Sequence, residues 1–283
     1  VQEVLNDIPN SDKTSFKEDY VNIEQKVSVI IPARYKSSRF PGKPLVDILG
    51  KPMVVRVADL SSKAVGKENV FVATDDDRIE DKVKEYNYNV VRTSEDCLTG
   101  TDRVAEASLQ IDADIFVNVQ GDEALLNPND IVQVVKEKIK NSNSVVTCMA
   151  KLTSSEDPND LKTCKVATNL NDELMYVSRN AIPSSKNGIV KSAFKQVCVY
   201  AFNKDELKTY FERGKDSGKT PAELSEDIEI IRFLEMGKRV KMVRVEGGTL
   251  AVDFPEDVSE VEKIFRKQQI YSQITDKRKS GIR

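Results

Sequence analysis

Short apolar segments alternate with helix-like segments along the first 150 residues of the chain. The segment from Val27 to Ile31 is β-branched and apolar at nearly every position, as expected of a strand covered on both faces. Further strands are predicted at 70–73, 89–91, 114–119 and 144–150, with helices at 52–60, 77–86, 102–110 and from about 130. Because strand–helix–strand units give parallel strands, the pattern predicts a three-layer α/β domain with a mostly parallel sheet.

The alternation becomes looser after residue 150. The elements expected there are strands at 164–168, 174–178, 196–202 and 239–245 and helices at 221–236 and 256–268. They predict a smaller β-rich part. We interpret residues 26–268 as one domain with halves at 26–150 and 151–268, preceded by a tail or arm (1–25) and followed by a basic tail (269–283).

The chain contains no histidine, which excludes a Ser-His-Asp triad, a Cys-His pair and any His-ligated metal. Its 43 Lys and Arg against 46 Asp and Glu argue against a nucleic-acid-binding protein, which normally carries a basic excess. The four cysteines lack CxxC spacing and are interpreted as reduced thiols of a cytoplasmic protein. No segment approaches the ~20 apolar residues of a membrane helix, and no signal peptide is expected.

A polar loop with four cationic side chains follows the first strand, between Ala33 and Pro44. Ligands bind beyond the carboxyl ends of parallel strands, so this position favours binding of a polyphosphate. The loop lacks the GxxxxGK[ST] spacing of a Walker A motif. No GxGxxG motif follows the first strand, which argues against a dinucleotide-binding Rossmann fold. The alternative is a solvated basic surface loop.

Two carboxylates also follow predicted strands. Asp122 comes directly after the strand at 114–119, and Asp253 is expected at a strand end because it follows Leu250-Ala251-Val252 and precedes Pro255. Together with phosphate oxygens they could hold one or two Mg²⁺ ions, and Asp122 could also act as a general base. The alternative for Asp122 is a turn residue, because Gly-Asp is common in turns.

Six separated stretches resemble the 3-deoxy-manno-octulosonate cytidylyltransferase family. They are IPARYKSSRFPGKPL (31–45), VATDDD (72–77), TGTDRVAE (99–106), NVQGDE (118–123), YVSRNAIP (176–183) and VDFPED (252–257). The resemblance covers roughly residues 27–268 and implies a nucleotide-diphospho-sugar transferase fold. It also implies a reaction in which CTP and a 2-keto sugar acid give a CMP-sugar and pyrophosphate, for lipopolysaccharide or capsule assembly.

The resemblance assigns roles to individual residues. Arg34 and Lys43 are expected to bind the triphosphate and to act in catalysis with Asp122, and Arg39 is a weaker candidate. The positions expected near the nucleotide are Ala33, Ala73, Thr74, Asp75, Thr99, Gly100, Thr101 and Arg103; Thr101 and the neighbouring Asp102 could equally be plain N-caps. The sugar-acid candidates are Arg179, Gln120, Lys165 and Gln196, where Arg179 could instead form a structural salt bridge.

Some positions depart from the family pattern, mostly in the second half. Gln196 stands where a histidine is usual, and Ala124 stands where proline is usual. Glu223, Glu226 and Glu229 are expected on roughly one face of the helix at 221–236. Because of these departures, the identity of the sugar acid stays open. The substrate could be an amino or otherwise modified octulosonate, or another nonulosonate-like acid. A nucleotide-binding module without catalysis is the alternative from another class, and the second half is expected to form a homodimer.

Overall fold

Strand β1 (Val27–Ala33) lies in the middle of the sheet and is covered on both faces. Val29 and Ile31 belong to the hydrophobic core on one face, and Ile30 belongs to the core on the other. All three side chains are fully buried, as the apolar run predicts.

The computed structural model describes residues 25–37, 39–187, 193–247 and 250–279, with side chains as far as 267. The predicted arm at 1–25 lies almost entirely outside these residues.

The main sheet has the strand order β11-β7-β10-β6-β1-β4-β5. Its strands are β4 (Val70–Thr74), β5 (Asn89–Arg92), β6 (Ile115–Val119), β7 (Val145–Lys151), β10 (Phe194–Phe202) and β11 (Val240–Val245), in addition to β1. All pairs along this path are parallel except those made by β10, which runs antiparallel to both β6 and β7. The predicted mostly parallel α/β sheet is confirmed.

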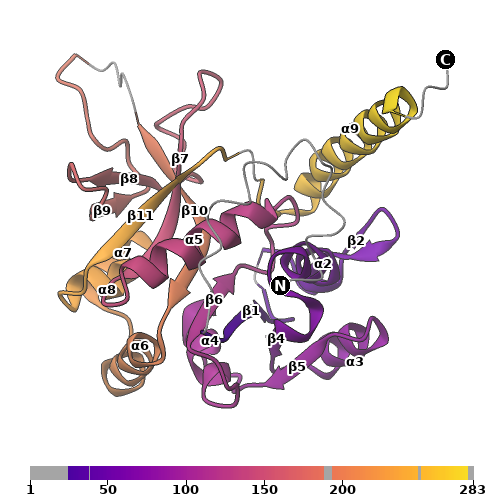
Figure 1. Cartoon of the computed structure of the whole chain (residues 1–283). Coiled ribbons are helices and arrows are strands. Elements are labelled where there is room, and N and C mark those ends of the chain that lie inside the picture. Colours follow the sequence, from indigo (N-terminus) through magenta and orange to yellow (C-terminus); the bar gives the residue numbers. More distant parts are fainter. Residues whose placement is uncertain (1–24, 38, 188–192, 248–249, 280–283) are drawn as a thin grey trace.

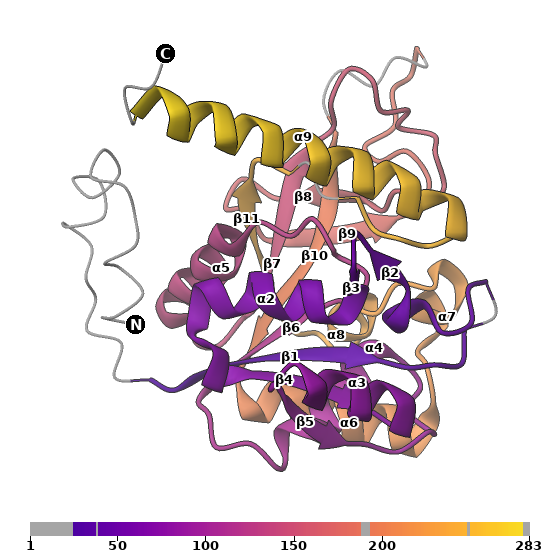
Figure 2. The same ribbon diagram turned by 90° about the vertical axis from the view of Figure 1, so that its right-hand side faces the viewer.

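Helices cover both faces and complete the three layers. One core joins the sheet to α2 (Met53–Val65), α3 (Asp77–Glu85) and α5 (Pro128–Lys140). The other core joins it to α4 (Gly100–Ser108), α6 (Lys204–Ser217) and α8 (Ile231–Glu235). Figure 1 shows α4 and α6 on the opposite side of β1 and β4 from α2 and α3. In Figure 2, α2 and α5 lie in front of the sheet.

Small elements complete the chain. A hairpin of β2 (Asp47–Ile48) and β3 (Lys51–Pro52) follows the 3-10 helix η2 (Lys43–Leu45), and a second 3-10 helix, η3 (Lys67–Asn69), precedes β4. Strand β8 (Lys165–Thr168) pairs with β9 (Leu174–Ser178) and β10, which extends the sheet as the predicted β-rich part. Within the described residues, no helix is both long and apolar enough to cross a membrane.

The second half differs from the prediction at three helices. The helix expected at 221–236 is two short helices, α7 (Pro221–Glu226) and α8, because Asp227 adopts a left-handed φ of 52° and ends α7. Helix α6 was not predicted, although Asn203 and Glu206 form a capping box at its start. Helix α9 (Pro255–Lys279) continues beyond 268 through most of the predicted basic tail and projects from the body (Figures 1 and 2).

Asp130, in the first turn of α5, is a buried carboxylate that weakens the fold at neutral pH. It is 2% exposed, and its Oδ2 atom has no hydrogen-bond partner among the residues that the structure describes. Burial, assisted by the negative charge of Glu246, raises the pKa of Asp130 to about 6. Because this value lies above the ordinary 3.8, ionisation costs stability as the pH rises from about 4 through 6.

We therefore expect Asp130→Asn to raise the free energy of unfolding by about 1–3 kcal/mol at pH 7.5. The gain should shrink as the pH falls towards 4, where the wild-type carboxyl is neutral in both states. Urea unfolding at a series of pH values measures the difference. Asp205→Asn, the same change in the exposed first turn of α6, is the control. A gain that does not depend on pH would contradict the explanation.

Candidate active site

A polar pocket opens at the carboxyl ends of β1 and β6. The loop after β1, the start of α4, the loop after β6 and three residues of the second half line it. Its charged and polar lining residues are Arg34, Ser37, Arg39, Lys43, Thr99, Gly100, Arg103, Gln120, Gly121, Asp122, Lys219, Asp227 and Glu229. The pocket therefore lies where ligands bind in open α/β sheets.

Lys43 joins the two carboxylates that the sequence singles out. Its Nζ lies 2.7 Å from Asp122 Oδ2 and 3.7 Å from Asp253 Oδ1, and Asp253 Oδ1 lies 3.2 Å from Arg39 Nη2. The backbone explains the meeting, because Val252 N donates to Asp122 O at 3.2 Å. Arg34, Lys43, Asp122 and Asp253 are thus gathered at one site, as the sequence predicts.

Gly121 allows the loop after β6 to pass close to the end of β1. A Cβ atom at this position would lie 2.8 Å from the carbonyl oxygen of Pro32, which is too close for any other residue without a shift of the backbone. The glycine therefore fixes Asp122 beside the cationic loop.

Asp122, which lines the pocket, and Asp253, which shares the Lys43 ammonium group with it, are the two carboxylates for which the sequence predicts Mg²⁺. Across the part of the chain that the structure describes, no group of three or more His, Cys, Asp or Glu residues could hold a metal. The ammonium group of Lys43 contacts both carboxylates, so the pair already shares a cation. Mg²⁺ is commonly held by one or two carboxylates together with substrate phosphates, and this donor set suits it.

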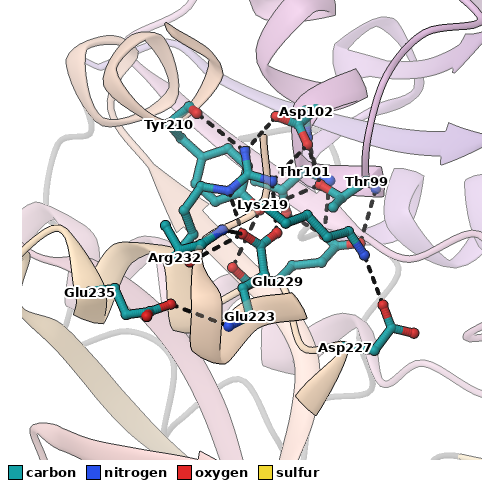
Figure 3. Close-up of polar contacts among 12 residues, drawn as sticks. Thr99, Thr101, Asp102, Tyr210, Lys219, Glu223, Asp227, Glu229, Arg232 and Glu235 are labelled. Carbon is teal, nitrogen blue, oxygen red and sulfur yellow. Dashed lines mark hydrogen bonds and ion pairs between the residues drawn. The ribbon is translucent and has the colours of Figure 1, made fainter. Parts of the chain in front are cut away.

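The N-terminus of α4 is occupied by a carboxylate of the protein. Glu229 accepts hydrogen bonds from Gly100 N at 2.9 Å, from Thr101 N at 2.8 Å and from Thr101 Oγ1 at 2.5 Å, while Thr99 caps the helix (Figure 3). Burial raises the pKa of Glu229 despite these bonds. Glu229 therefore lies in the pocket wall, a position that the expected single helix face did not reveal.

Arg103 connects α4 with the edge of the sheet. It is 3% exposed, and its Nη1 lies 2.6 Å from Thr93 Oγ1 and 3.3 Å from Asp75 Oδ1. Thr74 is buried and accepts a hydrogen bond from Asp76 N at 3.2 Å. Among the described residues, the lining includes Ala33 and Arg103 but not Ala73, Thr74 or Asp75.

Arg232 ties α4 to the second half. Its guanidinium group is fully buried, with Nη1 2.7 Å from Asp102 Oδ1 and both Nε and Nη2 2.7 Å from the carboxylate of Glu223 (Figure 3). Its Cζ lies 3.8 Å from the centre of the Tyr210 ring. Asp102 is therefore an ion-pair partner and not the cap, and Glu223 is bound to Arg232 while Glu229 is bound to the start of α4.

The predicted sugar-binding residues divide into two groups. Gln120 lines the pocket. Arg179 donates to three carbonyl oxygens, those of Glu226, Asp227 and Leu161, at 2.7–3.1 Å. Lys165 also donates to three carbonyls, including that of Arg179, and Gln196 donates to Tyr200 Oη at 3.2 Å.

Arg179, Lys165 and Gln196 are not part of the described lining of the pocket. The carbonyl contacts of Arg179 also replace the side-chain salt bridge that was its alternative interpretation. Glu226 also contacts the end of β9, because its carboxylate accepts hydrogen bonds from Ser178 Oγ at 2.7 Å and from Arg179 N at 2.9 Å. The three acidic residues expected on one face thus have three different sets of partners.

The open sheet with this pocket at its strand ends is that of an α/β nucleotidyltransferase. Residues 28–241 match the cytidylyltransferase family, and the chain belongs to this family. A solved structure of CMP:2-keto-3-deoxy-manno-octonic acid synthetase complexed with CTP superposes with a TM-score of 0.78 at 32% identity, over 86% of this chain and 99% of that chain.

Two curated relatives are similar over most of their lengths. The 3-deoxy-manno-octulosonate cytidylyltransferase of Geobacter metallireducens is 37% identical over 256 residues, which cover 86% of this chain and 99% of the relative. The 8-amino-3,8-dideoxy-manno-octulosonate cytidylyltransferase of Shewanella piezotolerans is 36% identical over 240 residues, 82% of this chain and 95% of the relative. The resemblance inferred from the six stretches is confirmed.

A substitution at Gly214 in α6 tests how much the buried ion pair of Arg232 with Asp102 contributes to stability. A Cβ atom there would lie 2.5 Å from Arg232 Nη1 and 2.7 Å from Asp102 Oδ1. Replacing glycine by alanine inside a helix normally stabilises by about 1 kcal/mol. Here we expect Gly214→Ala to lower the free energy of unfolding by about 2–4 kcal/mol, because the Arg232–Asp102 pair must separate. Denaturant unfolding measures the change.

Ser217→Ala, at the exposed end of the same helix, is the matched control and should change stability by less than about 0.5 kcal/mol. If Gly214→Ala were as stable as the wild type, the close contact would not limit this position.

Proposed function

We propose that the chain transfers CMP from CTP to a 2-keto-3-deoxy sugar acid, 3-deoxy-manno-octulosonate or a variant of it, and releases pyrophosphate. The observation that carries the proposal is the meeting of the cationic loop after β1 with Asp122 and Asp253 at the strand ends. The two curated relatives, named for that acid and for its 8-amino variant, support the substrate class. The CMP-sugar would supply lipopolysaccharide or capsule assembly.

Nucleotidyl transfer depends mainly on positioning and on neutralising charge. Arg34 and Lys43 line the pocket; in the proposed reaction Arg34 binds two phosphate oxygens with its planar guanidinium group, and Lys43 supplies a point charge. Asp122 and Asp253 would hold Mg²⁺, which when bound neutralises phosphate charge and lowers the pKa of the attacking hydroxyl. In the proposed reaction the anomeric hydroxyl bonds to the α-phosphorus as the bond to pyrophosphate breaks, and Asp122 accepts the hydroxyl proton.

The cellular compartment of the reaction is also part of the proposal. We place it in the cytoplasm, because all four cysteines are free thiols, as expected in a reducing compartment. The identity of the acid is tested by pyrophosphate release with a panel of 2-keto sugar acids that includes 3-deoxy-manno-octulosonate, its 8-amino variant and nonulosonates. Binding of CTP without release of pyrophosphate from any of them would favour the non-catalytic module.

Asp122→Asn should lower the turnover number by at least about 100-fold and leave the thermal stability within a few degrees of the wild type. The amide retains the shape of the side chain but loses the charge that faces Lys43. Pyrophosphate release at saturating substrates measures turnover. Asp216→Asn, on the exposed face of α6, changes the net charge equally and should retain full turnover. Near-normal turnover of Asp122→Asn would remove Asp122 from the reaction.

A homodimer would cover the apolar surface of the second half. Met175 in β9 is 65% exposed, Tyr176 in the same strand is 39% exposed and Leu224 in α7 is 67% exposed. We expect light scattering to give twice the chain mass of 31.7 kDa at micromolar protein, and Met175→Asp with Leu224→Asp to shift the mass towards a single chain. A wild-type mass near 31.7 kDa would contradict the dimer.

A further inference from the structure

A sugar acid carries a carboxylate that needs a cation in its binding site. Arg179 and Lys165 are the two cations that the sequence predicts for this role, and each donates to three backbone carbonyls. A cation in that position stabilises the loops around it and has few donors left for a ligand. Neither residue is part of the described lining, so the cation for the acid is sought among the residues that line the pocket.

Lys219 is the remaining candidate of the second half. Lys219, Asp227 and Glu229 are the described residues beyond 150 that line the pocket, and Lys219 is the cation among them. Its side chain is 24% exposed, and its Nζ lies 2.8 Å from Asp227 Oδ1 (Figure 3). In the first half, Lys43 and Arg39 contact Asp122 and Asp253, and Arg103 contacts Asp75.

The backbone at Lys219 is firmly held. The next residue, Thr220, forms a capping box with Glu223 at the start of α7. Glu223 is bound to the buried guanidinium of Arg232, which also binds Asp102 of α4. The base of the Lys219 side chain is thereby anchored to the same helix whose N-terminus forms a wall of the pocket.

The tip of Lys219, by contrast, is held weakly. Its partner carboxylate on Asp227 is 73% exposed. An ion pair with so exposed a partner contributes roughly 0–1 kcal/mol, because water competes for both charges. A carboxylate that enters the pocket can therefore replace Asp227 at the ammonium group at little cost, and Asp227 remains hydrated.

We propose that Lys219 binds the carboxylate of the sugar acid, exchanging Asp227 for the substrate, and so selects acids over neutral sugars. This assignment rests on the proposed function. It gives Asp227 a second role as a competing anion that occupies the ammonium group until the acid binds.

Lys219→Ala should raise KM for the sugar acid about 10- to 100-fold, the effect of losing one charge-assisted hydrogen bond, and change KM for CTP less than twofold. Lys219→Arg retains the charge and should stay within about threefold of the wild type. Lys208→Ala, which removes an exposed charge from α6, is the control and should leave both constants unchanged. Melting temperatures verify that each variant is folded.

Asp227→Asn should act in the opposite direction. Asparagine tolerates the left-handed backbone found here, and the substitution removes the competing charge, so KM for the acid should fall about two- to fivefold. Inhibition by a sugar acid without its anomeric hydroxyl, compared with its carboxamide, isolates the carboxylate. The wild type should prefer the acid at least tenfold, and Lys219→Ala should lose most of that preference.

Two failures are distinguishable. If the wild type releases no pyrophosphate with any acid, the proposed function fails, and this inference fails with it. If the wild type is active but Lys219→Ala raises both Michaelis constants equally, or keeps the preference for acid over carboxamide, only the assignment of Lys219 is overturned.

Discussion

The buried guanidinium group of Arg232 is the interaction on which the site depends. It binds Asp102 of α4 and Glu223 of α7, so one side chain joins the two halves of the chain. Taking three charges out of water is costly, and the cost is recovered only where every donor finds an acceptor in good geometry. The arrangement therefore tolerates little displacement, and it fixes where α4 begins relative to α7 and α8.

That fixed relation explains why Glu229 meets the start of α4. The left-handed Asp227 ends α7, and two residues later Glu229 accepts both amides of Gly100 and Thr101. A carboxylate at a helix N-terminus is stabilised by the helix dipole and by hydrogen bonds. Since this anion site is filled by the protein, the proposed binding of the nucleotide phosphates relies on other groups of the pocket, such as the cations of the loop after β1.

The sequence was sufficient where topology decides the outcome. Arg34, Lys43 and Asp122 follow strands of one parallel sheet, and parallel strands bring their carboxyl ends together whatever the side chains do. It was insufficient where partners depend on loop paths. Arg179 and Lys165 look like free cations in the sequence, yet backbone carbonyls surround them, and no local pattern records a carbonyl contributed by a distant loop.

The same distinction separates the two substrates of the proposed reaction. The cations proposed to bind phosphate follow the strand ends, so altering them would be expected to disturb the binding of any nucleotide there. The residues proposed to face the acid, Lys219 and Asp227, belong to a short segment, 219–229, in which Glu223 binds Thr220 N and Arg179 binds Asp227 O. Substitutions in this segment can change which acid is bound without moving the sheet. Specificity for the sugar would then vary among relatives more readily than the use of CTP.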